Sequence, residues 1–216
     1  MRVGAVVLDM DGLLIDTEPV WRSAEKQVFA ELGVELSQAD LLDTTGVRID
    51  ELVRDFLPPG PGPSPAEVAD RITDAVVDQV RHAGEPMPGV PEAIALFRRS
   101  GLRLAIASSS PARLIDAVCA RLGLDIGIRC SALDEPHGKP APDVYLAAAR
   151  RLALSPARCL AVEDSPAGVV AAKEAGMSCL AVPDPLLAGD SRYRRADLVL
   201  RSLTELDEPV LRALTR

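Results

Sequence analysis

The sequence predicts an α/β fold in which a doubly wound parallel sheet carries a small all-α insert after its first strand. From residue 88 onward, short apolar runs alternate with helical segments, which is typical of a parallel sheet with helices on both faces. Residues 16–87 show helical periodicity and no convincing strand. The 216 residues, 48% of them hydrophobic, suffice for one sizeable domain and a smaller one. We therefore expect residues 1–15 and 88–216 to form a core domain, with residues 16–87 as the insert.

Residues 3–8 form an apolar run that predicts a strand buried on both faces. Asp9 and Asp11 follow, and they can lie on one side of the strand end because alternate side chains of an extended segment face the same way. Gly12 then lets the backbone turn sharply and lets a ligand approach closely. Two carboxylates this close require a cation or a proton between them, and Mg²⁺, which prefers oxygen ligands, is the candidate. The alternative is a strand that simply runs into a polar turn.

The first part of the insert predicts a helix that ends near Gly33, because its apolar residues recur at helical spacing: Trp21, Ala24, Val28, Phe29 and Leu32. Further helices are expected over residues 38–44, 49–56 and 66–82. Residues 58–65 are rich in alternating proline and glycine, which predicts a loop between the last two helices. A proline-rich docking motif is less favoured, since these prolines do not form a steady polyproline helix.

The rest of the chain supplies the remaining strands and helices of the sheet domain. Strands are expected over residues 102–107, 128–131, 159–162, 179–182 and 198–200. Helices are expected over residues 91–100, 111–122, 142–152 and 166–175. Ligands of such sheets bind at the carboxyl ends of the strands, so the polar residues that follow each strand are the candidates for a site.

Three serines follow the strand expected at 102–107. Ser110 is predicted to cap the next helix, with Pro111 in its first turn, so that backbone N–H groups and the positive helix end face outward. This arrangement suits a phosphoryl group, with Ser108 and Ser109 as further contacts. Plain capping explains Ser110 but says nothing about Ser108.

Two more polar groups follow later strands. Lys139 is one of only three lysines and stands in a loop with two prolines; its ammonium suits a phosphoryl oxygen, although a solvated loop lysine is equally possible. Glu163 and Asp164 end the strand expected at 159–162. Asp9, Asp164 and a backbone carbonyl could form an octahedral Mg²⁺ site, whereas the alternative is that the two acids only favour a helix N-terminus.

Charge and cysteine content narrow the possible partners. The 24 Lys and Arg residues against 32 Asp and Glu residues give a net charge of −8, which disfavours nucleic acid. The N-terminal apolar run is too short for a signal peptide or a membrane span, so we expect a cytoplasmic protein without a membrane partner. A monomer is the default expectation.

The four cysteines are expected to be buried thiols: Cys119, Cys130, Cys159 and Cys179. A zinc site has little support, because no histidine stands at ligand spacing from a cysteine.

The ordered motifs Asp9-x-Asp11-Gly12, Ser108, Lys139 and Glu163-Asp164 resemble those of the haloacid dehalogenase superfamily of phosphotransferases. The resemblance covers essentially the whole chain and is to the β-phosphoglucomutase-like branch, which has a Rossmann-like core and a helical cap after the first strand. The stretch 9–21 is most similar to phosphatases that act on 2-deoxyglucose 6-phosphate and hexitol phosphates.

The resemblance implies a Mg²⁺-dependent phosphatase for a small sugar or polyol phosphate ester. Asp9 would be the nucleophile that forms an aspartyl-phosphate, and Asp11 the general acid and base. Ser108 and Lys139 would bind the phosphoryl group. The metal would be held by Asp9, the Asp11 carbonyl and Asp164, with Glu163 in or next to that shell.

The cap is expected to select the substrate. Its start contributes Glu18 and Trp21, and the turn between its helices contributes Gly46, Val47 and Arg48. Arg48 could clamp a hydroxyl or a distal anion, and Trp21 could form an apolar wall. The alternatives are an exposed helix arginine and a core tryptophan. A hinge is expected where the chain crosses between the domains, near residues 16–18 and 85–88.

Other activities of similar proteins fit the residues less well. Phosphonate-cleaving relatives use a cap lysine, and Lys26 on the first helix is the one present here. Dehalogenating relatives lack the second aspartate, which is Asp11 here. Mutase relatives carry a histidine where Trp21 stands. They also carry a cap lysine to which no lysine of this chain corresponds. Receiver modules of two-component signalling combine similar groups, but in another order and in a shorter domain without an insert.

Overall fold

The protein forms a six-stranded, entirely parallel sheet, described here from a computed structural model for residues 3–43 and 47–215. The strand order is β3-β2-β1-β4-β5-β6, so the first strand lies at the centre between β2 and β4. This confirms the predicted doubly wound sheet. The strands are β1 (Ala5–Leu8), β2 (Arg103–Ser108), β3 (Ile128–Ser131), β4 (Cys159–Glu163), β5 (Ser178–Ala181) and β6 (Leu198–Val199).

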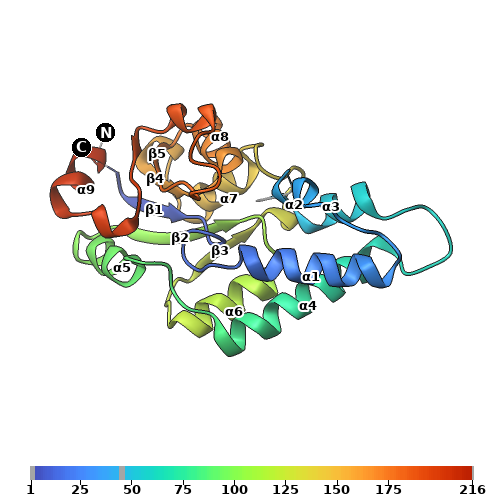
Figure 1. The fold of residues 1–216 in the computed structure, drawn as a ribbon. Coiled ribbons are helices and arrows are strands. Elements are labelled where there is room, and N and C mark those ends of the chain that lie inside the picture. Colours follow the sequence, from blue (N-terminus) through green and yellow to red (C-terminus); the bar gives the residue numbers. More distant parts are fainter. Residues whose placement is uncertain (1–2, 44–46, 216) are drawn as a thin grey trace.

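Helices cover both faces of the sheet, with α7 and α8 above it and α5 and α6 below it in Figure 1. The core helices are α5 (Val90–Arg99), α6 (Ala112–Leu122), α7 (Asp143–Arg151), α8 (Pro166–Glu174) and α9 (Glu208–Thr215). Side chains of β1 alternate between two hydrophobic cores, as expected for a pleated strand. Val6 and Leu8 join the core under α5 and α6, and Ala5 and Val7 join the core under α7 and α8. All four are fully buried, so β1 is held from both sides.

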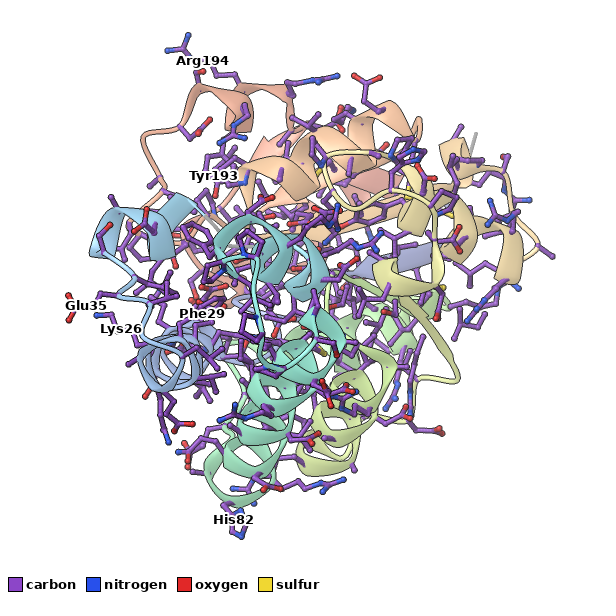
Figure 2. All side chains as sticks on the ribbon, turned by 90° about the vertical axis from the view of Figure 1, so that its right-hand side faces the viewer. Lys26, Phe29, Glu35, His82, Tyr193 and Arg194 are labelled. Carbon is purple, nitrogen blue, oxygen red and sulfur yellow. The ribbon has the colours of Figure 1, made fainter. Side chains whose placement is uncertain are left out.

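In its described residues, the insert contains four helices between β1 and α5: α1 (Glu18–Glu31), α2 (Gln38–Asp43), α3 (Ile49–Phe56) and α4 (Pro65–Ala83). Helix α4 begins with a capping box, in which Ser64 and Glu67 satisfy each other's backbone N–H groups. Phe29 of α1 is buried against Phe56 of α3, with ring centroids 6.4 Å apart. Figure 2 shows Phe29 directed inward, whereas Lys26 on the other side of α1 points away from the protein.

The two chain crossings between insert and sheet lie side by side. The Met87 N–H donates to the Leu14 carbonyl across 3.0 Å, and Ile15 forms an isolated bridge with Pro86. The proline and glycine segment connects α3 to α4 as a loop, as predicted. The division at residues 15/16 and 87/88, the hinge and any docking role of the loop stay predictions.

Besides shifts of one residue at several element ends, three details differ from the sequence-based expectations. Helix α9 was not predicted; Asp207 precedes it and accepts a hydrogen bond from the Val210 N–H at 2.8 Å. The helix expected from residue 111 begins at Ala112, and Ser110 does not cap it, because its hydroxyl donates to Asp11 instead. The strand expected over residues 3–8 is shorter and starts at Ala5.

The four cysteines are free and buried, as predicted. Among the described residues, the helices are either too short or too polar to cross a bilayer.

Candidate active site

Asp9 lies where β1 leaves the centre of the sheet. Its N–H donates to the Val162 carbonyl at 3.0 Å, which extends the pairing with β4 by one residue. Gly12 then adopts a φ of +74°, a conformation that glycine tolerates without strain. A Cβ at this position would stand 2.1 Å from Asp164 Oδ2, so the missing side chain leaves room for that carboxylate. The Gly12 N–H donates to the Ile15 carbonyl at 2.9 Å and closes the turn.

Three buried carboxylates converge at this edge of the sheet: those of Asp9, Glu163 and Asp164, whose nearest oxygens lie within 4.8 Å of one another. Burial raises the pKa of Asp9 to about 7; the charge of Glu163 adds to this effect and that of Lys139 opposes it. Burial also raises the pKa of Asp164, together with the charges of Asp9 and Glu163. Such a concentration of like charge indicates a cation site.

The environment of Asp164 Oδ1 shows whether a metal would fit this site. It is the one fully buried side-chain oxygen or nitrogen in the described part of the chain that lacks a hydrogen-bond partner. An unsatisfied buried acceptor is costly and calls for an explanation such as an ion. The oxygen donors around it suit a hard divalent cation such as Mg²⁺. The residues present therefore fit the metal that the sequence predicts.

Lys139 stands between two of these carboxylates. Its Nζ lies 2.6 Å from Asp9 Oδ1 and 2.6 Å from Glu163 Oε1, and 5.2 Å from the centre of the Tyr145 ring. Burial acts to lower the pKa of Lys139, but the two carboxylates outweigh it and hold the pKa above its ordinary value. The ammonium is thus buried and charged, which excludes the alternative of a solvated loop lysine.

Glu163 is surrounded by protein donors. Its Oε1 accepts hydrogen bonds from Lys139 and from the Tyr145 hydroxyl, both at 2.6 Å. Its Oε2 accepts from the N–H groups of Asp164 and Ser165 and from the Ser165 hydroxyl, at 3.0–3.1 Å. The carboxylate therefore orients Lys139, and its contact with a metal stays a prediction.

Asp11 is held by four hydrogen bonds from two sides. Its Oδ1 accepts from the Thr17 hydroxyl at 2.6 Å and from Trp21 Nε1 at 3.1 Å. Its Oδ2 accepts from the hydroxyls of Ser108 at 3.1 Å and Ser110 at 2.8 Å. One oxygen thus faces the insert and the other faces the end of β2, so the carboxylate links the two parts.

Comparisons with known proteins identify the family. Residues 3–176 match the model of the haloacid dehalogenase-like hydrolases. The chain belongs to this family. Hexitol phosphatase B of Escherichia coli K12 is 42% identical to this hydrolase over 210 residues, which cover 95% of each chain. Protein CbbY of Rhodobacter capsulatus is 38% identical over 205 residues, covering 88% of this chain and 89% of that protein.

Solved structures agree with the fold of this hydrolase. CbbY from Rhodobacter sphaeroides, in complex with phosphate, superimposes with a TM-score of 0.86 at 29% identity and covers 94% of this chain and 96% of its own. A β-phosphoglucomutase from Clostridium difficile gives a TM-score of 0.86 at 19% identity, covering 99% and 97%, a likeness in fold alone. The resemblance found in the sequence is confirmed.

A cavity of this hydrolase lies between the strand ends and the insert. The predicted residues that line it are Asp9, Asp11, Glu18, Trp21, Val47, Ser109, Lys139 and Asp164. Ser108 is fully buried behind the wall, with its hydroxyl on Asp11. Arg48 is outside the wall: its guanidinium donates to the Asp50 carboxylate at 2.6 and 2.9 Å and to the Glu135 carbonyl at 3.1 Å. Gly46 lies outside the described residues.

Sequence analysis missed several residues of the wall: Arg22, Glu25, Leu41, Ile49, Leu52, Ser110, Pro111 and Ser165. A helical periodicity could have found two of them. Glu18, Trp21, Arg22 and Glu25 stand at positions i, i+3, i+4 and i+7 of α1, which is one face of a helix. Burial raises the pKa values of Glu18 and Glu25 to about 7, and Arg22 opposes the shift in both; the charge of Asp11 adds to that at Glu18.

Proposed function

We propose that this hydrolase is a Mg²⁺-dependent phosphatase of small sugar or sugar-alcohol phosphate monoesters, acting through an aspartyl-phosphate on Asp9. The observation that carries the proposal is the setting of Asp9, between the buried Lys139 ammonium and the unsatisfied Asp164 oxygen, inside a cavity roofed by the insert. The 42% identity to Hexitol phosphatase B supports the substrate class.

In the first step, an Asp9 oxygen attacks phosphorus and the bond from phosphorus to the ester oxygen breaks. The leaving alkoxide takes a proton from the Asp11 carboxyl. In the second step, Asp11 takes a proton from water, whose oxygen attacks phosphorus, and the bond to Asp9 breaks to release phosphate. Such a covalent route divides a very slow hydrolysis into two easier steps.

The neighbours of Asp9 support both steps. Lys139 places a fixed positive charge beside the attacking carboxylate, where negative charge of the phosphoryl group would gather. Asp9, the Asp11 carbonyl and Asp164 would hold Mg²⁺, which neutralises phosphoryl charge when bound. Asp11 is oriented by four donors: Thr17, Trp21, Ser108 and Ser110. The two serines connect Asp11 to the end of β2, where we propose that the phosphoryl group binds.

The alternative of a mutase is disfavoured by Trp21. The indole N–H that contacts Asp11 is a donor only and cannot exchange protons with a substrate, unlike a histidine at this place. The route of the phosphonate-cleaving relatives, in which a cap lysine forms a Schiff base, is disfavoured because Lys26 is exposed and points away from the protein in Figure 2. A receiver without turnover is disfavoured by membership of a hydrolase family.

The test is phosphate release from hexitol phosphates, hexose 6-phosphates and β-glucose 1-phosphate, with and without Mg²⁺. We expect Mg²⁺-dependent turnover that Asp9→Asn abolishes. Asp125→Asn is the matched control, since Asp125 is exposed and precedes β3 at the opposite edge of the sheet. Conversion of β-glucose 1-phosphate to the 6-phosphate without phosphate release would replace the phosphatase by a mutase.

A further inference from the structure

Glu25 is a buried carboxylate without a protein partner. It is 6% exposed and lines the cavity, and in the described part of the chain its carboxylate has no hydrogen bond and no ion pair within 4.0 Å. Arg22, the cation that acts on it, forms its ion pair with Glu18 at 3.3 Å instead. The Glu25 oxygens are not fully buried, so within the cavity they remain open to a ligand that donates hydrogen bonds, which would offset the cost of their partial burial.

The position of Glu25 places it at the far end of the substrate. Trp21, on the same face of α1, contacts Asp11, which marks the ester oxygen in the proposed reaction. A helix rises 1.5 Å per residue, so Glu25 lies about 6 Å beyond Trp21 along α1. In a pentitol or hexitol that is phosphorylated at one end, the hydroxyls at the other end lie at a comparable distance from the ester oxygen.

The charge of this wall disfavours a second anion. Glu18 and Glu25 both face the cavity from α1, where Arg22 is the one cation among the described lining residues of that helix and already pairs with Glu18; the other lining cation, Lys139, lies at the strand ends between Asp9 and Glu163. Arg48, which could otherwise receive a distal phosphate, is paired with Asp50 and lies outside the wall. The other described insert residues of the wall are apolar and suit the C–H faces of a carbon chain: Leu41, Val47, Ile49 and Leu52.

We propose that Glu25 accepts hydrogen bonds from the far hydroxyls of the substrate, and thereby selects monophosphates of uncharged polyols over esters that carry a second phosphate. The inference rests on the proposed phosphatase function and names its substrate class. A carboxylate offers two oxygens and can accept from two neighbouring hydroxyls, whereas a second phosphate on the same chain brings only acceptors and negative charge.

The test compares three esters in the Mg²⁺-supplemented enzyme: a hexitol 6-phosphate, the matching hexitol 1,6-bisphosphate and p-nitrophenyl phosphate, which has no hydroxyls. Wild type is expected to prefer the monophosphate to the bisphosphate by at least about 10-fold in kcat/KM. In Glu25→Leu, the ratio of kcat/KM for the hexitol phosphate to that for p-nitrophenyl phosphate should fall about 10- to 100-fold, as expected for losing hydrogen bonds to a charged group.

Two further variants make the result specific. Glu25→Gln keeps the shape and one acceptor, so it should show a smaller fall and a reduced discrimination against the bisphosphate. Glu31→Gln, on the exposed side of α1, should leave all three ratios unchanged, because its pair with Arg71 is at the surface.

The outcomes separate the two proposals. If wild type hydrolyses none of the esters, the proposed phosphatase function fails. If p-nitrophenyl phosphate is hydrolysed in an Asp9-dependent manner but Glu25→Leu leaves the ratio unchanged, or wild type prefers the bisphosphate, the role of Glu25 is overturned and the phosphatase stands.

Discussion

Trp21 Nε1 donates a hydrogen bond to Asp11 Oδ1 across 3.1 Å. This contact joins the first helix of the insert to the residue that we propose as the acid and base. The position of the insert therefore sets the position of Asp11, and a displaced insert would leave Asp11 with its two serine donors alone on the side of β2.

We expect Trp21→Phe to lower kcat about 10-fold with a smaller change in KM, because the ring remains but one donor to a charged group is lost. The measurement is steady-state kinetics with a hexitol phosphate. Lys26→Ala, on the outer side of the same helix, is the control. An unchanged kcat in Trp21→Phe would show that the hydroxyls of Thr17, Ser108 and Ser110 orient Asp11 without the indole.

Binding of Mg²⁺ should raise the stability of the folded protein. In wild type, Mg²⁺ at 100 times its Kd should raise the free energy of unfolding by about 2.7 kcal/mol. Asp164→Asn should lose this increment, since it removes the unsatisfied carboxylate. Without metal, the same variant should unfold at a higher temperature than wild type, because it no longer buries a charge beside Asp9 and Glu163.

Thermal unfolding with Mg²⁺ or EDTA measures both effects, with Asp125→Asn as the control that should behave as wild type. A full Mg²⁺ increment in Asp164→Asn would place the ion elsewhere.

Gly12→Ala should disrupt the site more than its backbone conformation alone explains. The added methyl would meet Asp164 Oδ2, so we expect a loss of about 3 kcal/mol or more and loss of the Mg²⁺ increment. Gly33→Ala is a matched control, since Gly33 has a φ of +76° and open space around its missing side chain. It should cost only about 1 kcal/mol, from backbone strain. Equal losses in urea denaturation would show that Asp164 yields to the methyl group.

The raised pKa of Glu25 predicts a pH-dependent stability. Below pH 4.5 the carboxyl is protonated in the folded and unfolded states, so it contributes nothing. Between pH 4.5 and about 7, the unfolded chain releases a proton that the folded protein keeps, and stability falls as pH rises. Above that range the destabilisation levels off at about 3 kcal/mol.

Urea denaturation at pH 5 and pH 8 measures this dependence. Glu25→Gln should be more stable than wild type at pH 8 and closer to it at pH 5. Glu31→Gln should follow wild type at both values. If Glu25→Gln is no more stable than wild type at pH 8, burial of the Glu25 carboxylate does not destabilise the folded protein.

The gathering of polar side chains at the strand ends could be predicted from the sequence because the topology of the sheet brings them together. Asp9, Lys139 and Asp164 each follow a strand or precede a core helix, and parallel strands present their carboxyl ends at one edge. The expected helices and strands were recovered within two residues in most cases for the same reason: apolar periodicity reports which face is buried.

Residues whose partners are distant in sequence could not be predicted in the same way. Ser110 has the local pattern of a helix cap, but Asp11, 99 residues away, takes its hydroxyl. Arg48 was expected to face a substrate, and besides pairing with Asp50 its guanidinium donates to the Glu135 carbonyl, 87 residues away. Glu25 stands on a periodic polar face, yet its burial depends on how the insert packs on the sheet.

The paired crossings at Leu14 and Met87 have a consequence for how this protein could be altered. Because the chain leaves and re-enters the sheet domain at hydrogen-bonded neighbours, we expect that another insert could be joined at these two points, provided that it again supplies donors to Asp11 in place of Thr17 and Trp21. A different insert at the same two points would be expected to change which substrates reach the proposed site.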